Sequence, residues 1–238
     1  MKRSVILIFT LVLSLLSFKV RAQTQVPDLE HLYAGYTPTV FKGTAEIFSL
    51  FHQMPTDFEA GKKSKSQCFQ RAEIWTYDFA RNHHVAAMKV FIFYTHSYRN
   101  FKEAKGEDFD WWFHVAPYVL YQGSSGAIQE AVLDPTFADK PMNMQAWSKL
   151  FVNSGKSCKE FVRFSDFADE VKDNASKPST EDCYLVRVPA TDYDPNAVEA
   201  RDSGSVTGYQ FDLDEVAVAV ENAPNPSFRK EIKNRLGL

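Results

Sequence analysis

The chain has 238 residues, of which 45% are hydrophobic and 24% are charged, with a formal net charge of −3. Residues 1–22 hold four of the 27 basic residues and none of the 30 acidic ones, so the chain without them has a formal charge of −7. Such a chain lacks the excess of lysine and arginine that neutralises phosphates, which argues against a nucleic-acid partner.

Residues 1–22 have the pattern of a secretory signal peptide. A basic start precedes an apolar run from Val5 to Phe18, and Ala22 ends a segment of the kind that a signal peptidase cuts. The apolar run is too short to span a bilayer comfortably. We therefore expect an exported protein, secreted or periplasmic, whose mature form does not enter the membrane. The remaining residues, 23–238, suit a single domain.

Two helices are predicted in the N-terminal half. Thr44–Met54 has apolar residues at the spacing of an amphipathic helix. In the second helix, Cys68–Arg81, the residues Cys68, Ala72 and Trp75 share one face. Cys68 therefore stands in the first turn of a helix.

Three strands follow these helices. The segments Val85–Tyr94, Trp111–Tyr121 and Ala127–Leu133 are rich in β-branched and aromatic residues, which is typical of strands. The glycine-rich turn at residues 123–126 joins the last two strands into an antiparallel hairpin.

The C-terminal part has weaker patterns. Met144–Phe151 and Phe161–Val171 are interpreted as helices, Tyr184–Val188 and Tyr209–Leu213 as strands, and Pro226–Leu238 as a terminal amphipathic helix. The whole pattern predicts an α+β fold in which a central helix packs against an antiparallel β-sheet.

The chain has three cysteines, an odd number for a protein expected in an oxidising compartment. Cys158 and Cys183 both lie in the C-terminal third among polar residues, and we expect them to form a disulfide. Cys68 is then the spare thiol. A buried cysteine without a function is the alternative for Cys68.

A cysteine acts as a nucleophile only as its thiolate, which a helix N-terminus and a nearby imidazolium both favour. Cys68 has the first of these by its place in the predicted helix. Of the six histidines, His114 alone lies within a predicted strand among apolar residues. A lone histidine in such a place is by default a core residue, so a role in catalysis depends on a partner.

The predicted hairpin supplies that partner. In an antiparallel hairpin the numbers of opposed residues have a constant sum, and a turn at residues 123–126 predicts a sum near 248 or 249. The numbers of His114 and Asp134 sum to 248, so Asp134 is expected opposite His114 or one place from it, with Cβ atoms about 5 Å apart. A carboxylate so placed can orient an imidazole that takes a proton from a thiol. An incidental pair at a strand end is the alternative.

Several further residues are candidates for the site. The backbone N–H of Cys68 is unpaired in a first helical turn and could stabilise an oxyanion, with the side chain of Gln67 as a weaker possibility. Trp111 and Trp112 could line a substrate cleft beside the histidine, although one of them is equally suited to the core. Asp192–Asn196 has oxygen atoms at a calcium-like spacing but lacks the full loop signature, so we interpret it as a turn and expect no metal site.

Four short segments together resemble the bacterial protein-glutaminases, also called protein-glutamine deamidases. They are Cys68–Ala72 (CFQRA), Phe113–Ala116 (FHVA), Leu133–Pro135 (LDP) and Ala146–Trp147 (AW). The order of the motifs and the spacing of 20 residues between the histidine and the aspartate carry the resemblance. It covers about half of the chain that follows the signal peptide.

The resemblance implies a fold related to the transglutaminase and papain-like enzymes. It implies hydrolysis of glutamine side-chain amides in proteins or peptides, with release of ammonia and without a metal or organic cofactor. By position, Cys68 would be the nucleophile, His114 the base and acid, and Asp134 the group that orients the histidine. Two positions depart from the family pattern, because Glu73 replaces a histidine and Gln67 replaces a glycine.

Other functions remain open at this point. The same three residues could serve a transglutaminase or a papain-like cysteine peptidase, since all of these enzymes form an acyl-enzyme. A non-catalytic binding module on the same fold is a further alternative, although it would not need a thiol, an imidazole and a carboxylate together. We expect the protein to act as a monomer.

Overall fold

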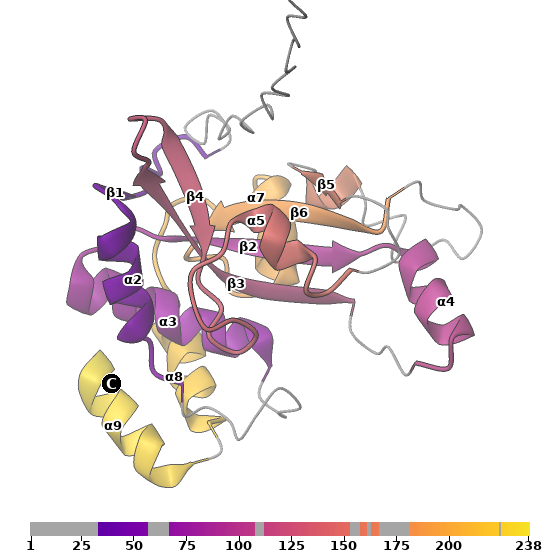
Figure 1. Cartoon of the computed structure of the whole chain (residues 1–238). Helices are drawn as coiled ribbons and strands as arrows, with labels where there is room; N and C mark the ends of the chain where they lie inside the picture. Colours follow the sequence, from indigo (N-terminus) through magenta and orange to yellow (C-terminus); the bar gives the residue numbers. More distant parts are fainter. Residues whose placement is uncertain are drawn as a thin grey trace, which may run out of the picture.

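The computed structural model describes residues 33–56, 67–107, 112–152, 158–160, 163–166, 181–223 and 225–238. The predicted signal peptide lies outside the described residues. Figure 1 shows a central sheet with helices α2, α3, α8 and α9 gathered on one side, whereas α4 lies apart from them beyond the far end of the long strands. None of the helices in the described ranges is long and apolar enough to cross a bilayer.

The sheet is built around three long strands. Strand β2 lies between β3 and β6 and pairs with both in antiparallel fashion, and the β3–β4 hairpin is also antiparallel. Two short edge strands, β1 and β5, pair in parallel with β3 and β6. The bounds are β1 Val40–Phe41, β2 Met88–Tyr94, β3 Phe113–Gln122, β4 Ile128–Val132, β5 Cys158–Glu160 and β6 Cys183–Pro189. The expected α+β class is confirmed, with an antiparallel sheet that carries parallel pairs at its edges.

Helices α2 and α3 agree with the sequence prediction, whereas α4 occupies a segment that was interpreted as a polar loop, and the later helices differ further from the prediction. The helix bounds are α2 Thr44–His52, α3 Cys68–His83, α4 His96–Ala104, α5 Met144–Ser148, α7 Pro195–Asp202, α8 Leu213–Glu221 and α9 Pro226–Leu236. The predicted strand Tyr209–Leu213 is wrong, because Asp212 accepts hydrogen bonds from the backbone of Asp214 and Glu215 and begins α8. Most of the predicted helix Phe161–Val171 lies outside the described residues.

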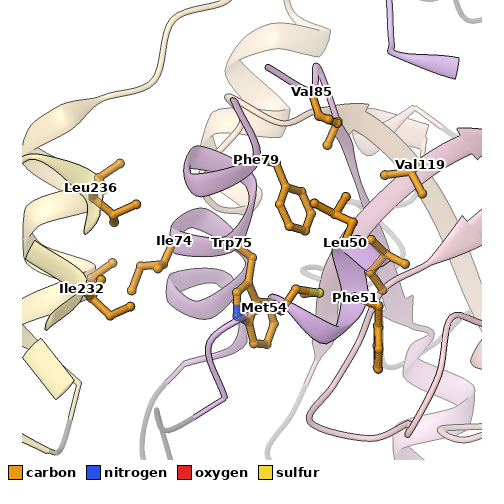
Figure 2. Close-up of a cluster of buried hydrophobic side chains, with 14 of the residues drawn as sticks. Leu50, Phe51, Met54, Ile74, Trp75, Phe79, Val85, Val119, Ile232 and Leu236 are labelled. Atoms are coloured by element: carbon orange, nitrogen blue, oxygen red, sulfur yellow. The ribbon is translucent and has the colours of Figure 1, made fainter. Parts of the chain in front are cut away.

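Helix α3 is held on two sides by apolar side chains. Figure 2 shows Ile74 facing Ile232 of α9, while Phe79 points toward Leu50 of α2. Trp75 belongs to the same buried cluster and is 2% exposed. Burial of each such side chain contributes about 1.5–3 kcal/mol. This packing fixes the direction of α3 and hence the place of its first residue, Cys68.

The two faces of β2 contact different helices. Successive side chains of a strand point to opposite faces. Phe91 lies in one buried cluster with Ala72 of α3, whereas Ile92 lies in another with Trp147 of α5. All seven residues of β2 are buried. The sheet therefore lies between α3, which begins with Cys68, and α5. Strand β3 of this sheet carries His114.

Candidate active site

Cys68 is the first residue of α3 and is partly exposed. The preceding residue, Gln67, is the N-cap and makes no capping hydrogen bond through its side chain, which is exposed. The first N–H groups of a helix have no partner within the helix, and the positive end of the helix dipole favours an anion there. The backbone N–H of Cys68 and the helix terminus are therefore available to a developing negative charge.

The other two cysteines form the expected disulfide. Cys158 and Cys183 are bonded, with Cα atoms 4.5 Å apart, and they are opposed residues of the parallel pair β5–β6. Among the cysteines in the described ranges, Cys68 is the one outside a disulfide. The prediction of a single spare thiol is thereby confirmed.

His114 and Asp134 form a buried pair. The Nε2 atom of His114 and the Oδ2 atom of Asp134 are 2.9 Å apart, and both side chains are 1% exposed. His114 lies in β3, and Asp134 lies two residues beyond the end of β4. The contact that the hairpin predicted is present.

The register of the hairpin differs from the predicted one. Tyr118 is opposite Val132, so the numbers of opposed residues sum to 250 rather than to 248 or 249. Asp134 is therefore two places from the position directly opposite His114. A shift of two residues keeps a side chain on the same face of a sheet, whereas a shift of one would have moved it to the other face. This is why the contact survives the change of register.

The charge on His114 is stabilised from both sides of the ring. Burial lowers its pKa, but the charge and hydrogen bond of Asp134 together with those of Cys68 raise the pKa above its ordinary value of 6.5 to about 9. Because Asp134 takes Nε2, the nitrogen that remains for the thiol is Nδ1. The structure thus brings together the three residues that the sequence singled out: a thiol, an imidazole and a carboxylate.

Aromatic side chains that no sequence pattern assigned to the site surround this pair. Trp147 of α5 donates its indole N–H to Oδ2 of Asp134 over 2.9 Å and is fully buried. The rings of Phe137 and Phe151 lie 5.0 and 4.7 Å from the ring of His114, measured between centroids. Trp147 stood out only as part of a family motif, and no local pattern pointed to the two phenylalanines.

Tyr94 is a further neighbour that the sequence did not reveal. It is 1% exposed at the end of β2, where it is opposed to Cys183 of β6. Burial raises its pKa well above the ordinary value, and electrostatic interactions with Cys68, Tyr98 and Asp134 add to this. Tyr94 therefore lies within electrostatic reach of the thiol and the carboxylate.

The predicted cleft residues are only partly described. Trp111 lies outside the described residues. Trp112 is half-buried and contacts Phe93 and Phe164, with ring centroids 5.7 and 6.4 Å away. Trp112 and Cys68 both pack against the same buried cluster, so the indole lies on the nucleophile's side of the sheet.

The acidic positions noted in the sequence have structural partners. Glu73, at the place where the family pattern has a histidine, is fully buried and paired with Lys89 of β2. Asp194 accepts hydrogen bonds from the backbone of Asn196 and Ala197 and so begins α7, which means that part of the segment interpreted as a turn is the start of a helix. Within the described ranges, no group of His, Cys, Asp and Glu side chains is arranged to hold a metal ion.

A cavity of about 430 Å³ lies elsewhere in the fold, between β6, α7 and the segment around Tyr209. Asp192 and Arg201, which form an ion pair with N and O atoms 2.5 Å apart, both contribute to its wall. Cys68, His114 and Asp134 do not line it. The cavity is therefore separate from the cluster of predicted site residues.

Comparison with known proteins supports one family. A family model described as glutaminase matches residues 45–151, a segment that contains Cys68, His114, Asp134 and Trp147. The match covers 107 of the 238 residues, and over this segment the chain is similar to the glutaminase family. The match supports the family predicted from the sequence motifs.

Solved structures of protein-glutaminases are also similar to the chain. The NMR structure of protein-glutaminase from Chryseobacterium proteolyticum is 15% identical, with 80% of this chain and 95% of that chain covered and a TM-score of 0.45. A crystal structure of protein-glutaminase is 17% identical, with 80% and 95% covered and a TM-score of 0.44. A crystal structure of pro-protein-glutaminase is 17% identical, with 80% of this chain and 63% of that chain covered and a TM-score of 0.43. The comparison with curated proteins finds no match.

Proposed function

We propose that this protein hydrolyses the side-chain amide of glutamine residues in proteins or peptides, giving glutamate and ammonia. The observation that supports this most directly is the cluster of Cys68, His114 and Asp134 inside the segment that is similar to the glutaminase family. A thiol at a helix N-terminus, beside an imidazole that is held by a buried carboxylate, is suited to nucleophilic attack on an amide carbon.

In the proposed first step, the thiolate of Cys68 attacks the amide carbon of the substrate. The helix N-terminus and the backbone N–H of Cys68 stabilise the oxyanion of the tetrahedral intermediate. The imidazolium of His114 gives its proton to the amide nitrogen, so that the carbon–nitrogen bond breaks, ammonia leaves and a thioester remains. Asp134 stays ionised and stabilises the imidazolium.

In the second step, water hydrolyses the thioester. His114 takes a proton from the water as the oxygen attacks the carbonyl carbon, and a second tetrahedral intermediate forms. Its collapse breaks the carbon–sulfur bond, releases glutamate and regenerates the thiolate–imidazolium pair of Cys68 and His114. The overall reaction consumes one water and yields one ammonia, and it needs no redox partner.

Export from the cytoplasm belongs to the same proposal. The disulfide between Cys158 and Cys183 supports it, because disulfides persist in oxidising compartments. We also propose that the protein acts as a monomer on its protein substrates.

The test uses the purified protein with a glutamine-rich protein and with a blocked glutaminyl dipeptide. Ammonia is measured, and the reacted positions are mapped by mass spectrometry. We expect ammonia and a mass increase of about one unit at glutamine residues, with both signals lost in the Cys68→Ala variant. Crosslinked products would identify a transglutaminase instead, and new chain ends would identify a peptidase. Equal activity in the Cys68→Ala variant would refute the mechanism in every form.

A further inference from the structure

The indole of Trp147 has a defined place beside the pair of His114 and Asp134. We propose that Trp147 is a positioning residue, whose N–H holds the carboxylate of Asp134 against His114. Its effect on turnover rests on the proposed function, whereas its effect on His114 can be measured without turnover. Trp147 is fully buried, so it acts through Asp134 rather than through contact with a protein substrate.

The hydrogen bonds of Asp134 are concentrated on one oxygen. Oδ2 accepts from Nε2 of His114 and from Nε1 of Trp147, each over 2.9 Å. In the part of the chain that the structure describes, Oδ1 is buried without a hydrogen-bond partner. A carboxylate bound through one oxygen can rotate and exchange its oxygens unless a second donor fixes that oxygen. Trp147 is this second donor.

A backbone bridge and a helix cap hold the segment between Asp134 and Trp147 in place, and this fixes the position of the indole. Val132 and Met142 form an antiparallel bridge with N–O distances of 2.7 and 3.0 Å. Asn143 then begins α5, because its side chain accepts from the backbone N–H of Ala146 over 2.8 Å. The bridge holds the start of α5 beside the end of β4, so the donor and the carboxylate are brought together by a short closed loop.

The surrounding rings exclude water from the pair. The ring of Trp147 lies 5.8 Å from that of His114 and 5.2 Å from that of Phe151, and Phe137 lies 5.0 Å from Phe151. In a poorly polarisable environment an ion pair is stronger, but a misplaced charge costs more. The carboxylate therefore has to be held in place for the imidazolium to be stable inside this shell.

The competing explanation is that Trp147 only fills space. The test compares Trp147→Phe with Trp75→Phe, a control in which the indole donates to a backbone oxygen and not to Asp134. Trp75 is also buried and donates its indole N–H over 2.7 Å, to the backbone oxygen of Pro55. Both variants remove one indole ring system and one indole hydrogen bond, but only Trp147→Phe removes a donor to the carboxylate.

The readouts are the NMR titration of the His114 ring and the pH profile of kcat/KM. In Trp147→Phe we expect the pKa of His114 to fall by about one unit, because the freed carboxylate binds the imidazolium less well. The apparent pKa of the basic limb of the pH profile should fall by the same amount. Near neutral pH we expect kcat to fall roughly tenfold at an almost unchanged KM. Trp75→Phe leaves the hydrogen bond from Trp147 to Asp134 in place and should therefore shift both pH readouts much less than Trp147→Phe does.

Should Trp147→Phe fail to fold, benzothienylalanine at position 147 keeps the shape of the side chain and replaces the N–H by sulfur. An unchanged or increased pKa of His114 in the folded variant would overturn the proposal, as would an equal shift in Trp75→Phe. If the parent protein releases no ammonia from glutamine, the proposed function fails, but the NMR titration still decides whether Trp147 positions Asp134.

Discussion

Replacing Asp134 by asparagine should remove a pH-dependent part of the protein's stability. His114 is buried, and its pKa is raised to about 9 mainly by Asp134, with a further contribution from Cys68. A basic group whose pKa is higher in the folded state than in the unfolded state stabilises the fold while it is protonated. The stabilisation is complete below pH 6.5 and is lost as the pH rises through about 9.

The magnitude follows from the difference between the two pKa values. A rise from 6.5 to about 9 corresponds to roughly 3 kcal/mol of the free energy of unfolding. In Asp134→Asn the charge is gone, and the burial that lowers the pKa of His114 remains. We therefore expect the variant to be less stable than the parent protein by roughly 3 kcal/mol near pH 6.5 and by much less near pH 10.

Urea unfolding at these two pH values measures the effect. The quantity compared is the change in free energy of unfolding between the two pH values, in the parent protein and in the variant. Titrating groups that do not interact with His114 or Asp134 contribute equally to both proteins. One of them is Asp192, whose pKa is raised to about 6 by burial despite its pairing with Arg201. Asp192 therefore titrates mostly below the compared pH range of about 6.5 to 10.

An equal loss of stability between the two pH values in the parent protein and in the variant would contradict the prediction. That result would mean that Asp134 does not hold the charge on His114. A variant that is destabilised equally at both pH values would show that Asp134 matters for packing or hydrogen bonding but not for the ionisation of the histidine.

Three further predictions concern the thiol, the disulfide and a buried ion pair. Iodoacetamide should label one thiol per molecule, Cys68, and abolish ammonia release; a second labelled site would contradict the disulfide. Changing both Cys158 and Cys183 to serine should lower the free energy of unfolding by roughly 3 kcal/mol in a urea titration, given the 25-residue separation, and an unchanged midpoint would count against it. Lys89→Met should cost roughly 3–5 kcal/mol near pH 7, because it leaves Glu73 buried and unpaired. Adding Glu73→Gln should recover most of this loss, and no recovery would show that the charge of Glu73 is not the cause.

The elements that sequence patterns predicted well are those with strong local signals. The apolar face of α3 and the aromatic, β-branched strands β2 and β3 are present close to the expected bounds. Helices α7 and α8 were not predicted because the apolar face of α7 is weak and the start of each helix depends on a single capping residue. Asp194 and Asp212 provide these caps, and Val198 and Val216 are buried only because other parts of the chain pack over them.

The sequence by itself determined which chemical groups are available and where they stand locally. An odd number of cysteines left Cys68 without a partner, helical periodicity placed it at the start of a helix, and the hairpin placed Asp134 near His114. Tertiary structure decided the rest, because the contact of Asp134 with His114 lies beyond the end of β4 and depends on the register of the sheet. Trp147 reaches the same carboxylate from α5, 13 residues further along the chain, and no periodic pattern reports such a contact. Periodicity describes the face of one element, whereas the state of His114 depends on side chains from several elements that meet only in the folded protein.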